Sequence, residues 1–336
     1  MKSPETNSRL LVCDCHEAWI YQLGQLDQPM DVIVGLKGRH TSSWDTAMRP
    51  VPQNARIIHL QEALACKDPY DCVIAHNLSD LLDLKALIAP RLFVLHGTLE
   101  GILAEQRSRT TAEELRSAVA QYVCLTGAHV MAVSALKGHS WGFESDIVPL
   151  SADPREYLEY RGDLARGLRV ANHIHNKKRT LLWDFHEHAF EGIPLTIVGH
   201  NDDMPGVLPA RDWRDLKHIL SRHRFFVHTA DPQYEDGYNM ATLEAMAAGL
   251  PVLGNRHPTS PIEHGVSGFL AGDPQELKEY ARRLLGDAEL AARLGREARK
   301  RVADKFSPLQ FKKGLLRSID CAGKKWRERA FAGHTA

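Results

Sequence analysis

Two carboxylates stand eight positions apart in the second half of the chain, and carboxylates accept hydrogen bonds from hydroxyl groups. Asp236 comes just before a predicted helix that begins at Tyr238 or Asn239 and ends at Ala248. Glu244 lies inside this helix, where its neighbours three and four positions away are apolar. A carboxylate on an apolar helical surface needs hydrogen-bond donors, so this pair is the leading candidate for binding a ligand.

The predicted elements around the pair form a strand–helix–strand unit. A strand over Phe225–Thr229 leads through a loop into the helix, and a second strand follows over Pro251–Gly254. The helix start then lies at the carboxyl edge of the sheet, where unpaired N–H groups and the helix dipole attract phosphate. Gly237 lets a ligand approach the backbone closely. Alternatively, Asp236 is an N-cap or Asx-turn acid that satisfies the amide of Asn239, and spacing alone leaves both interpretations open.

Short apolar runs alternate with helix-length amphipathic segments through most of the chain. This alternation predicts an α/β fold with doubly wound parallel sheets, which bind ligands at the carboxyl ends of their strands. A polar stretch at 151–161 separates two series of expected strands. We therefore expect two Rossmann-like domains, over residues 1–155 and 156–310, and a terminal helix and tail, 311–336, that packs back on the first domain.

The first series of expected strands is Leu10–Cys13, Asp31–Val34, Ala55–His59, Cys72–His76, Leu92–His96, His129–Ser134 and Asp146–Pro149. The second series is Leu168–Asn172, Leu195–Gly199, Phe225–Thr229 and Pro251–Gly254. Amphipathic helices are expected at the end of the chain, over Leu277–Leu285, Ala288–Phe306 and Pro308–Trp326.

Composition bounds the class of protein. The chain has 336 residues, more than one hydrophobic core usually supports. Its formal net charge is +0, so no overall field recruits nucleic acid. No apolar run approaches the roughly 18 residues of a membrane span. The six cysteines do not have the paired spacing of a zinc site. Cys13 and Cys15 alternate on a predicted strand and are expected to be small core residues. A reducing cytoplasm is the expected compartment.

The segment around the carboxylate pair matches a family pattern. From Asp236 it contains an acid, seven residues, and a glutamate within Leu-Glu-Ala-Met-Ala-Ala-Gly-Leu-Pro-Val. It resembles the donor-binding signature of retaining glycosyltransferases of family four, the group 1 glycosyl transferases, which have the GT-B fold of two facing Rossmann-like domains. The resemblance continues through Glu263–Leu270 and Phe306–Pro308. It covers the second domain well and the first loosely.

The resemblance implies a role for each matching residue. Glu244 would bind the ribose hydroxyls of a nucleotide-diphospho-sugar, and Asp236 would contact the hydroxyls of its sugar. The backbone amides that would face the sugar and the diphosphate are those of Gly237, Tyr238, Asn239 and Met240. The family more often has glutamate in place of Asp236, and the shorter side chain could alter sugar preference or reach less far.

A diphosphate also calls for cations, and a basic run follows the strand expected to end at Asn172. The run opens a predicted helix, so its groups could meet phosphate at a helix start. The family usually has Gly-Arg here and a lysine about five positions on. In this chain Ala171-Asn172 replaces Gly-Arg, and either Lys177 or Lys178 fills the later place. The alternative is a solvated basic helix start.

Two strands of the first domain end in histidine, at His76 and His96. The carboxyl end of a parallel strand is where such folds place ligands. His96 resembles the family's histidine that lines the sugar site, and the alternative is a histidine that caps its strand through a backbone hydrogen bond. After the first strand the family often has Gly-Gly, whereas this chain has Asp-Cys-His-Glu-Ala-Trp. His16 and Trp19 are therefore further candidates for contacting an acceptor.

The loop after the strand Pro251–Gly254 is a third candidate for binding the ligand. The family tends to have Gly-Gly and a glutamate there, and this chain replaces them. Thr259 and Ser260 could still offer amides and hydroxyls to phosphate. A plain turn is the alternative.

We expect no metal site. His173 and His175, and also His186 and His188, are pairs that suggest a metal. His186 and His188 are two positions apart on a predicted helix and face different ways, so they could not both ligate easily. No Asp-x-Asp occurs in the chain, which counts against metal-dependent sugar transferases. The basic terminal run around Trp326 suits an anionic membrane surface or, more commonly, a solvated helix face.

The resemblance implies a metal-independent retaining glycosyltransferase of the hexosyltransferase type. It would move a sugar from a nucleotide-diphospho-sugar, its donor substrate rather than a cofactor, to a hydroxyl acceptor. That acceptor is a glycan, a lipid-linked molecule or a small molecule. The donor would lie against the second domain, the acceptor against the first, and the chemistry in the cleft between them.

The sequence also leaves two alternative functions open and predicts where the protein is located. A GT-B nucleotide-sugar epimerase or hydrolase, and a nucleotide-sugar-binding protein without transfer activity, are the alternative functions. No nucleic-acid partner is expected. The location is the cytoplasm, with peripheral contact at the inner membrane face as an option.

Overall fold

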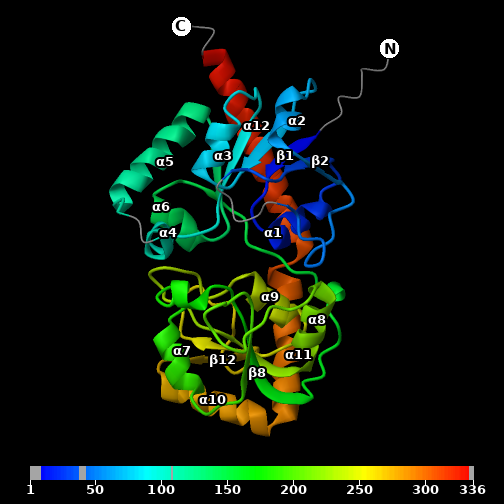
Figure 1. The fold of residues 1–336 in the computed structure, drawn as a ribbon, viewed down its shortest axis with the longest axis vertical. Coiled ribbons are helices and arrows are strands. Elements are labelled where there is room, and N and C mark those ends of the chain that lie inside the picture. The colour runs from blue at the N-terminus through cyan, green and yellow to red at the C-terminus, as the bar shows by residue number, and fades with distance from the viewer. Residues whose placement is uncertain (1–8, 38–42, 107–108, 333–336) are drawn as a thin grey trace. The chain divides into compact units, whose positions relative to one another are not determined.

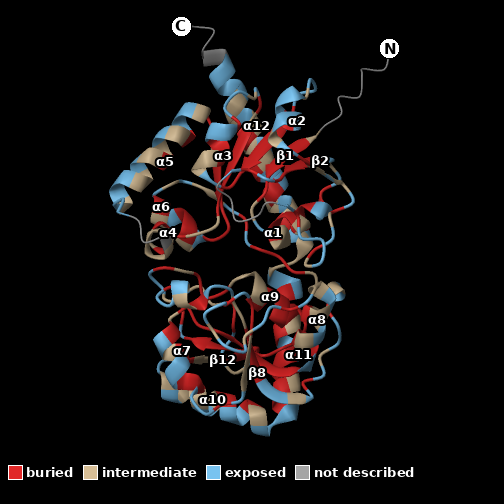
Figure 2. Ribbon diagram, viewed as in Figure 1, coloured by how far each residue is buried: buried red, intermediate tan, exposed pale blue. Residues whose placement is uncertain are grey.

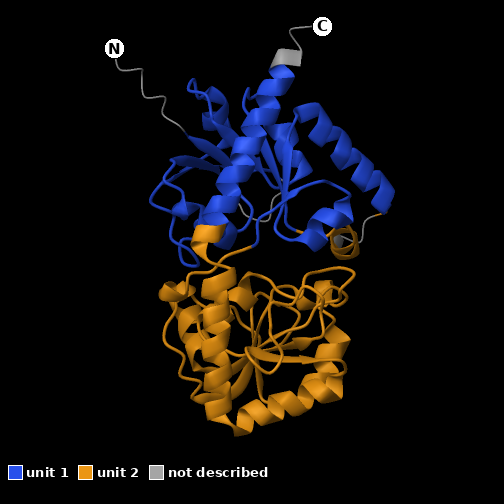
Figure 3. Cartoon of the chain, turned by 180° about the vertical axis from the view of Figure 1, so that it is seen from behind, with its two compact units in different colours: residues 1–96, 110–149, 311–336 blue, residues 97–109, 150–310 orange. Residues whose placement is uncertain are grey.

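The computed structural model describes residues 9–37, 43–106 and 109–332, and the chain forms two compact units (Figure 1 and Figure 3). Unit 1 comprises residues 1–96, 110–149 and 311–336, and unit 2 comprises residues 97–109 and 150–310. Each unit is built on one parallel sheet covered by helices, which confirms the predicted α/β class. The short segment 97–109 interrupts unit 1 in sequence but packs with unit 2.

The sheet of unit 1 has seven strands in the order β3-β2-β1-β4-β5-β6-β7, and neighbouring strands pair in parallel. The strands are β1 (Leu10–Cys13), β2 (Met30–Ile33), β3 (Ala55–Ile58), β4 (Cys72–Ala75), β5 (Arg91–Leu95), β6 (His129–Ala132) and β7 (Asp146–Ile147). The helices are α1 (Glu17–Tyr21), η1 (Gln22–Gln25), α2 (Leu60–Ala65), α3 (Leu78–Asp83), α5 (Ala112–Thr126), α6 (Ala135–Trp141) and α12 (Pro308–Ala332). The strand order places the carboxyl ends of β1, β4 and β5 side by side.

The sheet of unit 2 has five strands in the order β12-β11-β10-β8-β9, again all parallel. The strands are β8 (Leu164–Val170), β9 (Leu195–Val198), β10 (His223–His228), β11 (Val252–Asn255) and β12 (Gly268–Ala271). The helices are α4 (Leu99–Gln106), η2 (Pro154–Glu156), η3 (Ile174–Lys177), α7 (Trp183–Phe190), α8 (Trp213–Arg222), α9 (Met240–Ala247), α10 (Pro274–Gly286) and α11 (Ala288–Lys305). The order reverses between β8 and β10, and such a switch point is where open α/β sheets bind ligands.

Inner strands such as β1 and β4 are continuous apolar runs and are buried along their whole length (Figure 2), whereas the edge strands β3, β7 and β9 keep partly exposed residues. Strands covered on both faces read in this way because neither face meets water. The expected strands agree with the structure to within a few residues. One strand, β12, was not predicted, because it has only four residues and begins at Gly268. Gly268 lies against the backbone of β11, where a Cβ atom would come within 2.0 Å of the Val252 oxygen.

Helix α12 packs on unit 1 through one face, which carries Phe311, Leu315, Ser318 and Ala322, all at most 2% exposed. Two of its basic residues contact the C-terminal end of α5. Lys325 Nζ donates to the Ala128 oxygen at 2.7 Å, and the Arg329 guanidinium donates to the Cys124 oxygen. Cations are favourable at a helix C-terminus, where carbonyl groups lack intrahelical partners. Part of the basic terminal run is therefore used inside the unit. None of the described helices combines the length and the apolar composition needed to cross a membrane.

Substitution of Gly295 should destabilise unit 2. Gly295 lies inside α11, and a Cβ atom there would come within 1.9 Å of the Gly249 oxygen, which belongs to the backbone. We expect Gly295→Ala to lower the free energy of unfolding by about 1–3 kcal/mol, as overpacking does. The control is Gly323→Ala inside α12, where the nearest atom to the added Cβ is an Arg327 nitrogen at 3.4 Å. The control should raise stability by about 0.5–1 kcal/mol. Urea denaturation of both variants checks this, and equal stabilities would contradict the close packing of α11.

Candidate functional site

The candidate residues of unit 2 lie on loops at the carboxyl edge of its sheet. Asn172 and Lys177 follow β8, Asp236 follows β10, and Thr259 follows β11. These strands are neighbours in the order β11-β10-β8, and the switch point lies between β8 and β10. The fold thus brings residues that are up to 87 positions apart in the sequence to one edge of one sheet.

Two of these loops are joined by direct contacts. The Gly237 amide donates to Thr259 Oγ1 at 2.9 Å, and the Thr259 amide donates to Nδ1 of His257 at 3.1 Å. Gly237 also lies against the His257 ring, which a Cβ atom would approach to 2.8 Å. Burial lowers the pKa of His257, while the backbone of Glu235 and the charge of Asp236 act in the opposite direction. A neutral imidazole suits the role of acceptor for the Thr259 amide.

The N-cap of helix α9 is not Asp236. Its N-cap is Asn239, whose Oδ1 accepts the Thr242 amide at 2.9 Å, while Thr242 Oγ1 accepts the Asn239 amide at 3.4 Å. This reciprocal arrangement satisfies the amides of Asn239 and Thr242. The alternative in which Asp236 is the N-cap of this helix is therefore wrong. The helix begins at Met240, one or two residues later than predicted.

Both carboxylates of the pair are buried. Asp236 is 1% exposed and Glu244 is 5% exposed, the latter among apolar residues of α9. Burial of an ionised carboxylate is unfavourable unless donors surround it. These two residues are therefore parts of a structured region and not solvated surface charges.

The loop after β8 differs from the expectation. The basic run does not open an α-helix: it forms the short 3-10 helix η3, and α7 begins only at Trp183. His173 and Leu182 flank this segment with φ of 53° and 48°, the left-handed region that interrupts a regular helix. Asn172 Oδ1 accepts the His200 amide at 2.9 Å and so joins this loop to the one after β9.

The basic side chains of this loop have different surroundings. Lys177 Nζ lies 3.5 Å from Glu105 Oε2 of α4, while Lys178 is exposed. The guanidinium of Arg179 lies 4.3 Å above the ring of Tyr234. The Tyr234 oxygen accepts a hydrogen bond from Thr98 Oγ1 at 2.5 Å. Contacts of α4 and of the β8 loop therefore both reach the segment that precedes Asp236.

A buried arginine, which the sequence did not single out, lies beneath these loops. Arg169 of β8 is 1% exposed, and its Nη1 donates to Nδ1 of His186 at 2.9 Å and to Thr229 Oγ1 at 2.8 Å. Its Nη2 lies near the carbonyls of Leu181 and Thr229, and no carboxylate among the described residues pairs with it. Burial lowers the pKa of Arg169 to about 9. Burial and the neighbouring Arg169 hold the pKa of His186 well below its usual value, so His186 is a neutral acceptor.

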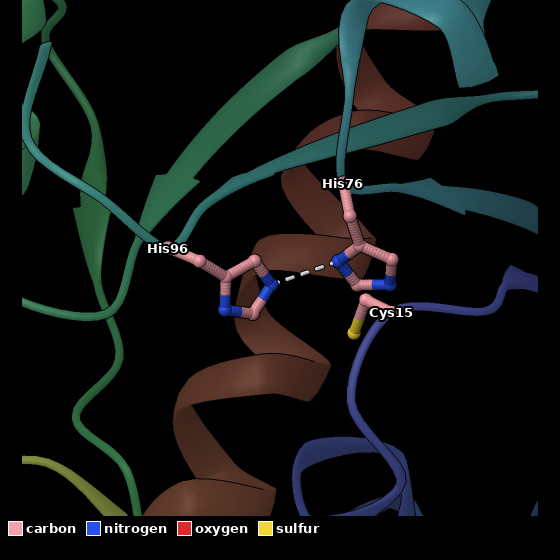
Figure 4. Close-up of side chains that lie close together, drawn as sticks. All are labelled: Cys15, His76 and His96. Carbon is pink, nitrogen blue, oxygen red and sulfur yellow. Dashed lines mark hydrogen bonds between the residues drawn. The ribbon is translucent and has the colours of Figure 1, made fainter. Parts of the chain in front are cut away.

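At the carboxyl edge of unit 1, His76 and His96 contact each other. Nδ1 of His76 and Nε2 of His96 are 2.9 Å apart, so one ring donates to the other (Figure 4). Cys15 joins them, although it lies beyond the end of β1 and not on the strand as predicted. Trp19 packs edge-on against both rings and is only 1% exposed. Trp19 is thus part of the core beneath the histidines, while His16 is exposed.

The other histidine pairs do not converge. His186 faces Arg169, whereas Nδ1 of His188 contacts the Asp184 oxygen of its own helix at 2.6 Å. Nδ1 of His175 is 2.7 Å from Asp203 Oδ2.

Ser260 donates its amide to the His257 oxygen at 3.1 Å, as residues in a turn do. The roles predicted for Lys178, Ser260 and the other candidate residues stay predictions.

Comparison with known proteins relates the chain to one family. Residues 188–287 match the family described as "Glycosyl transferases group 1". N-acetyl-alpha-D-glucosaminyl L-malate synthase of Bacillus anthracis is 37% identical over 76 residues, which are 21% of this chain and 20% of that protein. The chain therefore matches about a fifth of the length of this relative.

The similarity of structure extends over almost the whole chain. HepE from Anabaena, solved in complex with UDP-glucose, has a TM-score of 0.66 at 15% identity, covering 93% of this chain and 99% of that one. Sucrose-phosphate synthase from Thermosynechococcus elongatus has a TM-score of 0.64 at 14% identity, covering 97% and 100%. At this level of identity the similarity shows the fold, which is the GT-B fold.

The neutral His186 should make unit 2 sensitive to acid. Its pKa is lowered in the folded chain, so the unfolded chain binds more protons below pH 6.5 and stability falls as the pH drops below that value. We expect His186→Asn, which keeps an acceptor for Arg169, to reduce the slope between pH 6.5 and 5 by up to about 1.4 kcal/mol per pH unit. Urea denaturation across this range measures it. The control is His188→Asn at an exposed position of the same helix, and equal slopes for both variants would contradict the buried neutral ring.

Proposed function

We propose that this chain, whose residues 188–287 belong to the group 1 glycosyl transferases, transfers a sugar from a nucleotide-diphospho-sugar to a hydroxyl acceptor. One observation carries the proposal. The segment from Asp236 to Met240 lies at the carboxyl edge of the unit 2 sheet, next to its switch point, and leads directly into the helix that holds the buried Glu244. A helix start offers amides to phosphate, and the two carboxylates offer acceptors to sugar hydroxyls.

In this proposal a different carboxylate binds each end of the donor. Glu244 accepts hydrogen bonds from the ribose hydroxyls, and Asp236 accepts them from the transferred sugar. The amides of Tyr238 and Met240 face the sugar and the diphosphate, and the Asn239 amide would exchange its bond to Thr242 Oγ1 for one to the donor. The Gly237 amide already donates to Thr259, so we propose that this contact shapes the loop around the phosphates.

Positive charge would stabilise the leaving diphosphate. Lys177 or Lys178 supplies a flexible ammonium group on the loop after β8, and Lys177 would leave Glu105 to do so. The buried cation of Arg169, which no carboxylate of the described chain neutralises, adds a fixed positive field under the same loop. Asn172 holds this loop against the next one. With these cations and the helix amides, transfer needs no metal at the diphosphate.

The reaction would retain the configuration of the anomeric carbon. The leaving phosphate accepts the proton of the attacking hydroxyl on the face from which it departs, so no separate protein base is needed. His96 is the residue that the family resemblance assigns to the sugar. The acceptor is a glycan, a lipid-linked molecule or a small molecule. A location in the cytoplasm is part of the proposal, and the contacts of Lys325 and Arg329 with α5 leave only part of the basic run for a membrane surface.

Removal of either carboxylate should weaken binding of the donor. Loss of hydrogen bonds to a charged acceptor is worth about 1.5–3 kcal/mol, so Glu244→Ala and Asp236→Ala should raise the Kd of the nucleotide-sugar roughly 10- to 100-fold. The measurement is thermal shift with a panel of nucleotide-sugars, since a ligand at 100 times its Kd adds about 2.7 kcal/mol.

Transfer rates with the best donor complete this test. The control is Glu297→Ala, an exposed glutamate on α11 of the same unit, which should leave binding unchanged. Unchanged donor binding and transfer in both carboxylate variants would refute the proposed site. Donor turnover without any acceptor would instead indicate an epimerase or a hydrolase, and binding without turnover would indicate a binding protein.

The proposed chemistry also predicts independence from metals and retention. A strong chelator should not lower the rate of transfer, because the cations at the diphosphate are side chains and helix amides. An α-linked donor should give an α-linked product, and NMR of the first product formed identifies the anomer. A rate that falls with the chelator and returns with a divalent cation would contradict the first part. An inverted product would contradict the second.

A further inference from the structure

Three potential metal ligands meet at the carboxyl edge of the unit 1 sheet. Cys15 follows β1, His76 follows β4 and His96 follows β5, and these are consecutive strands in the sheet. Figure 4 shows the three side chains converging from separate segments of the chain. One ligand atom from each residue lies within 4.8 Å of the other two. The sequence did not suggest this set, because the residues are up to 81 positions apart and Cys15 was placed on a strand.

The spacing is close to that of a tetrahedral zinc site. Zinc takes nitrogen at about 2.1 Å and sulfur at about 2.3 Å, which puts two ligand nitrogens about 3.4 Å apart and nitrogen and sulfur about 3.6 Å apart. Nδ1 of His76 and Nε2 of His96 are already 2.9 Å apart. The two rings need to separate by about half an ångström and to turn so that both nitrogens face the ion. The sulfur, which lies within 4.8 Å of one nitrogen of each ring, needs to approach by up to about 1.2 Å.

The surroundings fix the ligands and leave them accessible. Asp80 Oδ2 accepts the amides of His76 and Asn77 at 2.7 and 2.9 Å, which holds the backbone of His76. Trp19 packs against both rings from the core side. Cys15 and His96 are partly exposed, so an ion has a way in. These contacts fix the backbone of His76 and the placement of both rings.

Some charged groups near the cluster favour binding of a cation, and others oppose it. Asp14, Glu17 and Asp80 lie near Cys15, and their negative charge favours a cation. His16 and Lys137 lie near His96, and positive charge on them opposes one.

A second cluster in unit 1 does not carry the same inference. His129, Asp146 and Cys321 also place three ligand atoms together. However, Asp146 Oδ2 is already 2.9 Å from Nε2 of His129 and accepts Ser318 Oγ at 2.8 Å. Hydrogen bonding between β6, β7 and α12 therefore accounts for two of its three members, His129 and Asp146.

We propose that Cys15, His76 and His96 form a binding site for one zinc ion, with water as the fourth ligand. The soft thiolate and the two imidazoles select zinc over magnesium or calcium, which prefer oxygen. On binding, the Cys15 thiol loses its proton to solvent and the Zn–S bond forms. The proton shared between the two rings moves to another nitrogen of the same ring, so each imidazole stays neutral. The net change is one zinc ion bound and one proton released.

The inference goes beyond the proposed function and does not depend on it. The ion would take up His96, which the proposed transfer uses for the sugar, so zinc should inhibit transfer. A chelator would then leave the rate unchanged or raise it, in agreement with transfer that needs no metal.

Direct binding tests the site on the full chain after metal removal. We expect one equivalent of zinc, measured by competition with a chromophoric chelator. Cobalt as the probe should give a thiolate-to-metal charge-transfer band. Cys15→Ser should abolish that band and weaken zinc binding at least about 100-fold, since loss of an outer-shell partner alone costs 10- to 100-fold. His76→Asn and His96→Asn should weaken it similarly, with circular dichroism showing that each variant is folded.

Cys321→Ser and Cys66→Ser are the matched controls and should bind zinc and cobalt like the unchanged protein. Zinc affinity that is the same in Cys15→Ser, or that falls in Cys321→Ser instead, would overturn the proposal. Absence of the charge-transfer band in the unchanged protein would also overturn it. Inhibition of transfer by zinc, expressed relative to the zinc-free rate of each variant, should be lost in Cys15→Ser. A protein that binds zinc but transfers no sugar would refute the proposed function and leave the site standing.

Discussion

The parallel pairing of both sheets is the constraint on which the rest of the structure depends. Each parallel strand must be followed by a crossover, and the helices of these crossovers cover the faces of the sheet. Only the edges remain open, and at the carboxyl edge the chain leaves every strand in the same direction. Cys15, His76 and His96 follow three neighbouring strands of unit 1, while Asn172 and Asp236 follow two neighbouring strands of unit 2. The parallel topology alone therefore brings polar side chains from distant parts of the sequence together at these two edges.

A second constraint is that polar groups near these edges are buried and must be satisfied. Asn239 and Thr242 satisfy each other's amides at the start of α9, so the N-cap of this helix is Asn239 and not Asp236. Arg169 is surrounded by hydrogen-bond acceptors that carry no charge, including a histidine that must be neutral to accept. This arrangement keeps a positive charge under the loops of unit 2 instead of cancelling it with an acid. A charge of this kind acts over a longer range inside the protein than on its surface, because solvent screens it less.

The sequence predicted the elements better than the contacts between them. Continuous apolar runs such as Cys72–Ala75 identified almost every strand, and the stop at Gly249 and Pro251 identified the end of α9. The start of α7 was misplaced because His173 and Leu182 adopt left-handed conformations that their residue types do not announce. Strand order could not be read from local patterns, so the meeting of Cys15 with His76 and His96 was missed. The same holds for Arg169 and His186, which are close only because β8 packs beside α7.

Under the two proposals, the histidine pair of unit 1 would serve two ligands of different strength. A hydrogen bond from a neutral imidazole to a sugar hydroxyl contributes about 0.5–1.5 kcal/mol, whereas zinc in a protein site contributes about 10–16 kcal/mol. In direct competition for His96 the ion would therefore win wherever it is free in solution. Two features of the cluster oppose binding of the ion: the Cys15 thiol must give up its proton, and Lys137 places a positive charge near His96. Under the two proposals, these effects would set the zinc concentration at which His96 changes from hydrogen bonding to metal binding, and they lie in residues outside the donor site proposed for unit 2.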